Sequence, residues 1–211
     1  MKRRETGEDG GADRASARPQ FLLAVALLCS GIACFGPMAF QSPQVLRSGQ
    51  GLVGAGATGD IYFSQPDNVM GLGDLCLYGR MGLGPQTDIG LKLVPDAVTL
   101  DAKYQFTQRG LLVAGDVAVI GGWYPGFFDA SSYPVFAVAP LLLFGEPRIW
   151  SGVGVVAGRG VWGRTGFDLM PRVLVGAAIG RRFQVIPELD YYWRRQYPTL
   201  FGGIGLQFRL W

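Results

Sequence analysis

Charged side chains recur at alternate positions of several apolar stretches, and they are the residues with the clearest potential for chemistry. We assign these charges to one face of predicted strands: Asp74, Arg80, Asp88, Lys92, Asp101, Lys103, Asp116, Arg172, Glu188, Asp190 and Arg209. Six acids against five bases favour mutual pairing, because unpaired charges in a narrow interior are costly. Asp88 is expected to approach Lys103, and Lys92 to approach Asp101, across adjacent strands. A salt-bridged polar interior is the first interpretation, and a small solute pocket is the alternative.

Other residue types that usually carry chemistry are scarce. The chain has no histidine, which removes the commonest general base and the commonest neutral metal ligand. Its three cysteines, Cys29, Cys34 and Cys76, have no CxxC spacing. The run GAGATG at 54–59 matches GxGxxG, but no helix is predicted after it, as a dinucleotide site would need. No GxSxG motif exists. We therefore expect no enzyme activity, no cofactor and no metal.

The elements that position these charges are predicted to be strands. In DIGLKLVPDAVTLDAKYQF, residues 88–106, apolar residues occupy every second position and polar ones lie between them. The run VFAVAPLLLF, 135–144, is apolar at both parities and also fits a buried helix, while Pro140 and Pro187 suggest bulges or kinks. We predict about ten strands, with eight as the alternative: 50–58, 73–83, 87–95, 97–107, 110–121, 134–144, 148–158, 170–179, 183–193 and 199–211.

Composition and connection lengths favour a membrane barrel over a soluble sheet. The chain is 49% hydrophobic and 17% charged, against about 25% charged in a typical soluble domain. It has no apolar run of the ~20 residues that a membrane helix needs. Tight turns alternate with longer connections at 59–72, 122–133 and 159–169, as in outer-membrane barrels. A net charge of +3 without a basic stripe argues against nucleic-acid binding.

The N-terminus is predicted to direct export. The apolar stretch FLLAVALLCSGIA, 21–33, has the length of a signal-peptide core and precedes Cys34. Ile32, Ala33 and Cys34 resemble a bacterial lipobox, which implies lipidation of Cys34, although Gly31 stands where leucine is usual. We assign residues 1–33 to a signal peptide, 34–49 to a periplasmic linker and 50–211 to the barrel.

The chain from about residue 45 onward resembles small bacterial outer-membrane β-barrels. Its C-terminal GGIGLQFRLW, 202–211, is similar to their last strand, which implies recognition by the barrel assembly machinery. Arg159, Arg164, Arg194 and Arg195 are candidates for contact with lipopolysaccharide phosphates. Aromatic residues near predicted strand ends are expected at the membrane interfaces: Trp123, Tyr124, Phe127, Phe128, Tyr133, Tyr191 and Trp193.

The sequence therefore predicts an all-β protein, an antiparallel up-and-down transmembrane barrel in the bacterial outer membrane. We expect a monomer in contact with outer-membrane lipid. Its role would be structural, adhesive or the binding of a narrow solute, without a wide pore. The alternative is a secreted or lipid-anchored soluble barrel that carries an apolar ligand. The two hypotheses place Leu91, Leu100 and Val175 on opposite faces, toward lipid in the first and around a ligand in the second.

Overall fold

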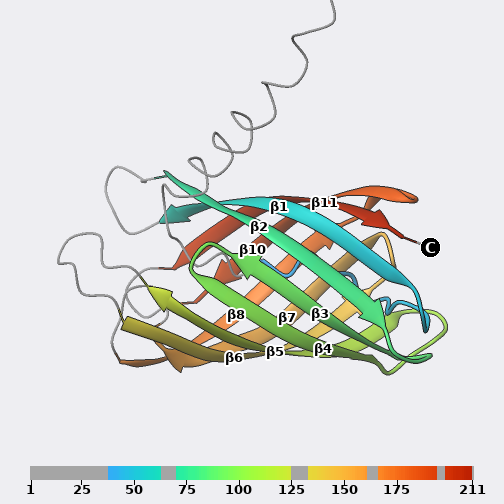
Figure 1. Cartoon of the computed structure of the whole chain (residues 1–211), viewed down its shortest axis with the longest axis horizontal. Coiled ribbons are helices and arrows are strands. Elements are labelled where there is room, and N and C mark those ends of the chain that lie inside the picture. Colours follow the sequence, from blue (N-terminus) through green and yellow to red (C-terminus); the bar gives the residue numbers. More distant parts are fainter. Residues whose placement is uncertain (1–37, 63–69, 125–132, 161–165, 194–197, 211) are drawn as a thin grey trace, which may run out of the picture. The chain divides into compact units, whose positions relative to one another are not determined.

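The computed structural model describes residues 38–62, 70–124, 133–160, 166–193 and 198–210, without the side chains of 60–62, 70–73, 124 and 133. Every regular element among these residues is a strand (Figure 1). The strands are β1 Gly51–Tyr62, β2 Met70–Gly82, β3 Thr87–Val94, β4 Ala97–Gln105, β5 Leu112–Tyr124, β6 Tyr133–Gly145, β7 Ile149–Arg159, β8 Phe167–Ala177, β9 Ile179–Gly180, β10 Phe183–Tyr192 and β11 Thr199–Arg209.

The strands form one closed antiparallel barrel. From β1 to β8 each strand pairs with the next in the chain, β8 pairs with β10, and β11 pairs with both β10 and β1, which closes the sheet. The two-residue β9 pairs with β10 in the same register as β8, so β8 and β9 are two parts of one strand. The prediction of an all-β barrel of about ten strands is confirmed, and residues 135–144 lie in a strand.

The two prolines interrupt the hydrogen-bond ladder on one side only. Pro140 is paired with Val117 of β5, but the pairing of β6 with β7 is interrupted at Ala139 and Pro140. Pro187 is paired with Ile204 of β11, while the pairing of β10 with β8 and β9 is interrupted beside it. Proline has no N–H to donate, which explains both gaps. We expected bulges or kinks at these prolines; the register is the same on both sides of each gap, so neither proline causes a bulge.

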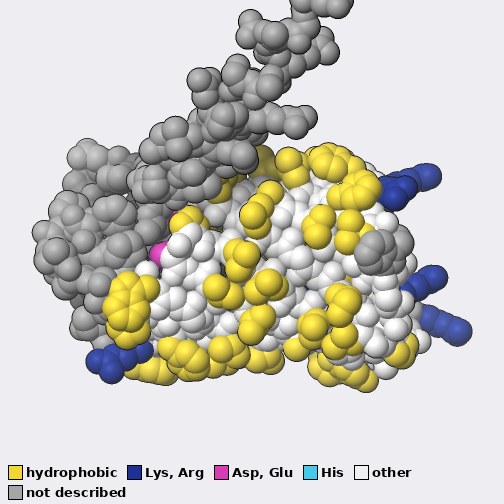
Figure 2. Space-filling view, in the orientation of Figure 1, with side chains coloured by type: hydrophobic (Ala, Val, Ile, Leu, Met, Phe, Trp, Pro, Cys, Tyr) yellow, Lys and Arg dark blue, Asp and Glu magenta, His cyan; other side chains and the backbone are white. Residues whose placement is uncertain are grey.

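The two faces of the barrel differ as the alternation predicts. Large apolar side chains point outward along the strands, and Leu77 and Leu100 are 62% and 60% exposed (Figure 2). The charged residues of the same strands point inward, where Asp88 and Asp190 are fully buried. Among the described residues, no helix has the length and apolar character required to cross a membrane.

The barrel has a turn end and an opposite end. Gly51 and Arg209 lie at the turn end, together with the connections 83–86, 106–111, 146–148 and 181–182. The segments 63–69, 125–132, 161–165 and 194–197 lie outside the described residues. β1, β2, β5 and β8 extend beyond their predicted ends, so the connections 63–69 and 125–132 are shorter than the 59–72 and 122–133 that we expected.

Candidate functional site

Residues 38–46, here called the lumen segment, lie inside the barrel. Met38, Phe40 and Leu46 are 0%, 2% and 5% exposed. Their sequence, MAFQSPQVL, contains no charged residue, although the surrounding lumen is lined with charges. Residues 38–46 of the predicted 34–49 linker are therefore packed against the lumen wall, which we did not predict from the sequence.

Side chains of the barrel wall bind the main chain of the lumen segment near the turn end. Lys103 donates from Nζ to the carbonyl oxygens of Ser42 and Gln44, at 2.9 and 3.1 Å. The N–H of Leu46 donates to Oδ2 of Asp88 at 3.0 Å, and that of Val45 donates to Oε1 of Gln105 at 3.0 Å. These contacts satisfy main-chain groups that would otherwise be buried without partners.

Deeper in the lumen the same kind of contact continues. Glu188 accepts the N–H of Ala39 at one carboxylate oxygen, at 2.7 Å, and the N–H of Phe40 at the other, at 2.9 Å. Lys92 donates from Nζ to the carbonyl oxygen of Met38 at 2.6 Å. Among the hydrogen bonds described, one joins a side chain of the lumen segment to the wall, from Nε2 of Gln41 to Oδ2 of Asp116 at 2.8 Å.

One cluster of ion pairs joins β2, β3, β4 and β5. Arg80 lies 2.5 Å from a carboxylate oxygen of Asp88, 2.5 Å from one of Asp101 and 3.9 Å from one of Asp116. Lys103 Nζ lies 3.5 Å from Asp88 Oδ2. Asp88 therefore binds two cations and a main-chain N–H of the lumen segment, which makes it the centre of the cluster.

A second cluster joins β8 and β10. Arg172 lies 3.6 Å from Asp190, and its guanidinium donates to the hydroxyl of Tyr192 at 2.9 Å. That hydroxyl donates in turn to Oδ2 of Asp190 at 3.0 Å. Arg172 and Asp190 were predicted from the sequence, but Tyr192 was missed, although its parity is that of Asp190.

The structure places the remaining predicted charges as follows. Asp74 is buried on β2 beside a register shift between β1 and β2, where its N–H donates to the hydroxyl of Thr58 at 3.1 Å. Arg209 is half-buried at the turn end. Asp88 and Lys103 are register partners, as expected. Lys92, however, lies opposite Thr99, and Asp101 lies opposite Gly90, so these two charges are not direct cross-strand neighbours.

Glycines on β1 and β11 make room for the side chain of Phe40. A Cβ atom at Gly56, Gly203 or Gly205 would lie 2.6, 2.9 or 3.0 Å from the ring of Phe40. We call these three glycines the glycine wall. The ring of Phe40 also stacks on Tyr78, with 5.9 Å between centroids. The GAGATG run thus lies in a strand and faces the lumen segment in part.

Phe40 has an unusual backbone conformation. Its φ is +48°, in the left-handed region, which bulky residues rarely adopt. Such strain persists only where surrounding contacts determine it. Here the contacts are Glu188 on the main chain and the glycine wall on the ring. Phe40 is therefore the point at which the lumen segment is most tightly specified.

Little space remains around the lumen segment. One cavity of about 50 Å³ lies among Phe40, Lys92, Asp116 and Arg172, and another of about 20 Å³ lies nearer the turn end. One water occupies ~30 Å³ of liquid volume, so these spaces suit single waters. No group of His, Cys, Asp and Glu in the described part of the chain is arranged to hold a metal ion.

The predicted interface aromatics divide into three groups. Trp123 and Trp193 are exposed on the outside, and Tyr191 packs edge-on against Trp193 at 6.3 Å. Tyr124 and Tyr133 are paired at strand ends, but their side chains are not described. Phe127 and Phe128 lie outside the described residues, as does Cys34. Lipidation of Cys34 stays a prediction.

Comparison with known proteins identifies no family. No protein-family model matches the sequence, and no curated protein is significantly similar to it. Two solved structures of Ail, the attachment invasion locus protein of Yersinia pestis, are similar to this chain. The structure in complex with the heparin analogue sucrose octasulfate has 10% identity and a TM-score of 0.33, and covers 77% of this chain and 99% of Ail. The other has 12% identity, a TM-score of 0.32 and the same coverage.

The translocator domain of the autotransporter NalP from Neisseria meningitidis is also similar. It shares 13% identity, with a TM-score of 0.41, and the match covers 93% of this chain and 96% of that domain. Likenesses at this level carry no argument about function. The closed antiparallel barrel of the chain itself, apolar outside and charged inside, is the architecture of a bacterial outer-membrane β-barrel protein.

Proposed function

We propose that this protein is a non-enzymatic outer-membrane β-barrel that is sealed by its own lumen segment and has a structural or adhesive role in the envelope. One observation carries the proposal. Seven main-chain groups of residues 38–46 are hydrogen-bonded by side chains of the wall. An open channel would leave these wall groups to water, whereas here they hold a polypeptide.

The small volume of the remaining cavities supports a closed barrel over a narrow-solute site. A small-molecule pocket usually has ~300–1,000 Å³, and the larger cavity in the lumen has about 50 Å³. A ten-stranded barrel is also far narrower than the 16–18-stranded porins. We therefore favour the structural or adhesive role over solute binding.

The orientation of the apolar residues disfavours a soluble carrier. Leu91, Leu100 and Val175 are 42%, 60% and 48% exposed on the outside of the barrel. A carrier would need them around an interior ligand, but the interior holds ion pairs and the lumen segment. A lipid environment accounts for this arrangement.

Two partners and an oligomeric state belong to the proposal. The alternation of β11, with Ile204, Leu206 and Phe208 on the lipid side, supports recognition by the barrel assembly machinery. Contact with lipopolysaccharide phosphates would involve Arg159, which is exposed at the end opposite the turns. The other candidates, Arg164, Arg194 and Arg195, lie outside the described residues. We propose a monomer, because the barrel is closed and each strand other than the two-residue β9 is paired on both sides.

Ion conductance in planar lipid bilayers tests the seal. The wild-type protein is expected to give no steady current, while a variant without residues 38–46 is expected to conduct. The deletion removes no charge, so a change in current reports the occupied volume rather than altered wall electrostatics. Steady wild-type conductance equal to that of the deletion variant would contradict the proposal.

A second variant covers the case in which the deletion prevents folding. Arg47, Ser48 and Gly49 are exposed, so a protease site inserted at Ser48 can be cut after the barrel has folded. We expect the cut protein to stay closed at first, because the hydrogen bonds remain, and to conduct once dilution or mild denaturant releases the segment. The shift of the compact form on SDS gels, before and after boiling, verifies that each barrel is folded.

A further inference from the structure

A crevice lies on the outer surface of the barrel at the turn end. It has a volume of about 470 Å³ and lies between the start of β7 and the junction of β8 with β9. Its lining includes Arg148, Ile149, Ala177, Ile179 and Arg181. It is separate from the lumen, so it has no part in the seal proposed above.

The crevice lies where the pairing of β7 with β8 ends, at Ile149 and Ala177. On the other side of β8, the pairing with β10 ends at Gly176 and resumes at Ile179 in β9, which leaves Ala177 and Ala178 without register partners on β10. The chain then turns at Gly180, where φ is +114° and a Cβ would lie 2.1 Å from the carbonyl oxygen of Phe183. β9 therefore extends beyond the first residue of β7 and borders the crevice.

The lining of the crevice is apolar toward the membrane and basic toward the turn end. Ile149 and Ile179 are 70% and 63% exposed, while Ala177, the register partner of Ile149, adds little bulk. Arg148 directly precedes Ile149 in the chain, and Arg181 follows Gly180, both exposed. Guanidinium groups at this boundary lie at the depth of lipid headgroups.

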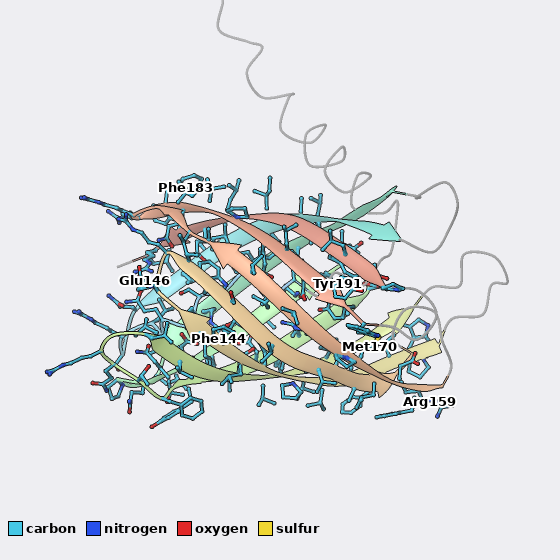
Figure 3. All side chains as sticks on the ribbon, turned by 180° about the vertical axis from the view of Figure 1, so that it is seen from behind. Phe144, Glu146, Arg159, Met170, Phe183 and Tyr191 are labelled. Carbon is cyan, nitrogen blue, oxygen red and sulfur yellow. The ribbon has the colours of Figure 1, made fainter. Side chains whose placement is uncertain are left out.

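The charge at this place is predominantly positive. Arg182 adjoins Arg181, and its guanidinium lies over the ring of Phe208 at 5.1 Å. Glu146 is the acidic residue of the turn that carries Arg148, and Figure 3 shows it at this end, opposite Arg159. Basic side chains, drawn dark blue, project from the turn end in Figure 2, and they are arginines because both described lysines lie in the lumen. Three arginines against one glutamate favour an anion.

We propose that this crevice binds an anionic phospholipid of the periplasmic leaflet, since the short turns of outer-membrane barrels face the periplasm. The phosphate would lie between Arg148 and Arg181, which can each donate paired hydrogen bonds to it. An acyl chain would cover the exposed apolar surface of Ile149 and Ile179. A free phosphate would leave that surface uncovered. Both features together select a lipid over a soluble anion.

Native mass spectrometry of the detergent-solubilised full chain tests this site. Phosphatidylglycerol and phosphatidylcholine are titrated separately, and one bound phosphatidylglycerol is expected at concentrations where phosphatidylcholine does not bind. The double variant Arg148→Gln/Arg181→Gln should lose about tenfold in affinity for phosphatidylglycerol, as expected for two exposed ion pairs. Equal binding of both lipids by the wild type would overturn the proposal.

A matched double variant controls for the loss of charge. Arg47→Gln/Arg109→Gln removes two exposed arginines at the same end of the barrel, outside the crevice, and should keep its affinity within about twofold. An equal loss in both double variants would show a diffuse field and refute a defined site. Soluble glycerol phosphate should fail to displace the lipid, and Ile179→Ser should weaken binding. If glycerol phosphate displaces the lipid fully, the site binds phosphate alone and the lipid proposal fails.

Discussion

The two walls of the lumen bind the same segment in different ways. The glycine wall on β1 and β11 has no side chains and contacts the ring of Phe40. The opposite wall, on β3, β4 and β5, presents Asp88, Lys92, Lys103 and Asp116. We call these four residues the charged wall. Three of them bind main-chain atoms of the lumen segment, and Asp116 binds the side chain of Gln41.

The two walls recognise the lumen segment in two different ways. Three of the four residues of the charged wall bind main-chain groups, so these hydrogen bonds hold an extended chain with little regard to its sequence. The glycine wall accommodates one ring by shape, so it fixes the position of the segment along the barrel. Substitutions in the two walls should therefore differ in size and in whether a second change can rescue them.

The largest effect is expected in the charged wall. Asp88→Ala removes the carboxylate that binds Arg80, Lys103 and the N–H of Leu46, and it leaves two buried cations with fewer partners. Breaking a buried ion pair costs about 3–5 kcal/mol of folding free energy. Urea unfolding in lipid vesicles measures it. Glu146→Ala, an exposed acid at the same end, should change stability by less than about 0.5 kcal/mol, and equal effects of the two would contradict this prediction.

The next effect concerns the ring that the glycine wall contacts. Phe40→Ala should lower the free energy of unfolding by about 3 kcal/mol, because the ring is 2% exposed and its loss leaves a cavity. Phe106→Ala is the control, since that ring is 57% exposed on the outside of the barrel. The same unfolding assay serves for both variants. An equal loss would mean that Phe40 is not packed against the glycine wall.

A smaller effect is expected from the glycine wall itself, and it should be rescued. Gly56→Ala places a methyl group 2.6 Å from the ring of Phe40, and overpacking of this kind costs about 1–3 kcal/mol. In the double variant with Phe40→Ala, the cost of the added methyl group should largely vanish, which a double-mutant cycle measures.

Gly121→Ala provides the control for that cycle, because a Cβ there would meet nothing within 4 Å. It should be neutral alone and additive with Phe40→Ala. Additive behaviour of Gly56→Ala would argue that the ring does not contact the glycine wall.

The smallest effect is expected at Glu188. Its carboxylate binds the main-chain N–H of Phe40, the residue whose ring contacts the glycine wall. Glu188→Gln keeps one acceptor oxygen, so one of the N–H groups of Ala39 and Phe40 retains its partner. We expect a loss of about 1 kcal/mol, and a larger one for Glu188→Ala, which removes both acceptors. A glutamine variant as unstable as the alanine variant would show that charge, and not hydrogen bonding, is decisive at this position.

The sequence predicted the barrel wall well because burial on one face imposes a period of two. All the predicted lumen charges, of which Asp88 and Asp190 are examples, occupy inward-facing positions of their strands. Register was harder to predict, since a short turn can shift one strand by two residues. Lys92 therefore lies opposite Thr99, and Arg80 from the neighbouring strand binds Asp101.

The lumen segment could not be predicted from its own sequence. Residues 38–46 have no alternation and no charge, and most of their contacts use main-chain atoms, which leave no pattern in side-chain types. The available signal lay in the wall: Gly54 and Gly56 on β1 and Gly203 and Gly205 on β11 leave a bare surface that something must fill. Small residues on the inward parity of a barrel are thus a sign of an internal segment.

The position of the Phe40 side chain tests most directly whether residues 38–46 fill the lumen. A photoreactive benzoylphenylalanine at position 40, irradiated in the folded protein in membranes, should crosslink within the same chain. Peptide mass spectrometry should find these crosslinks in β1, β11 and β2, near Gly56, Gly203 and Tyr78. Crosslinks to lipid, to other proteins or to none of these strands would contradict a lumen closed by residues 38–46.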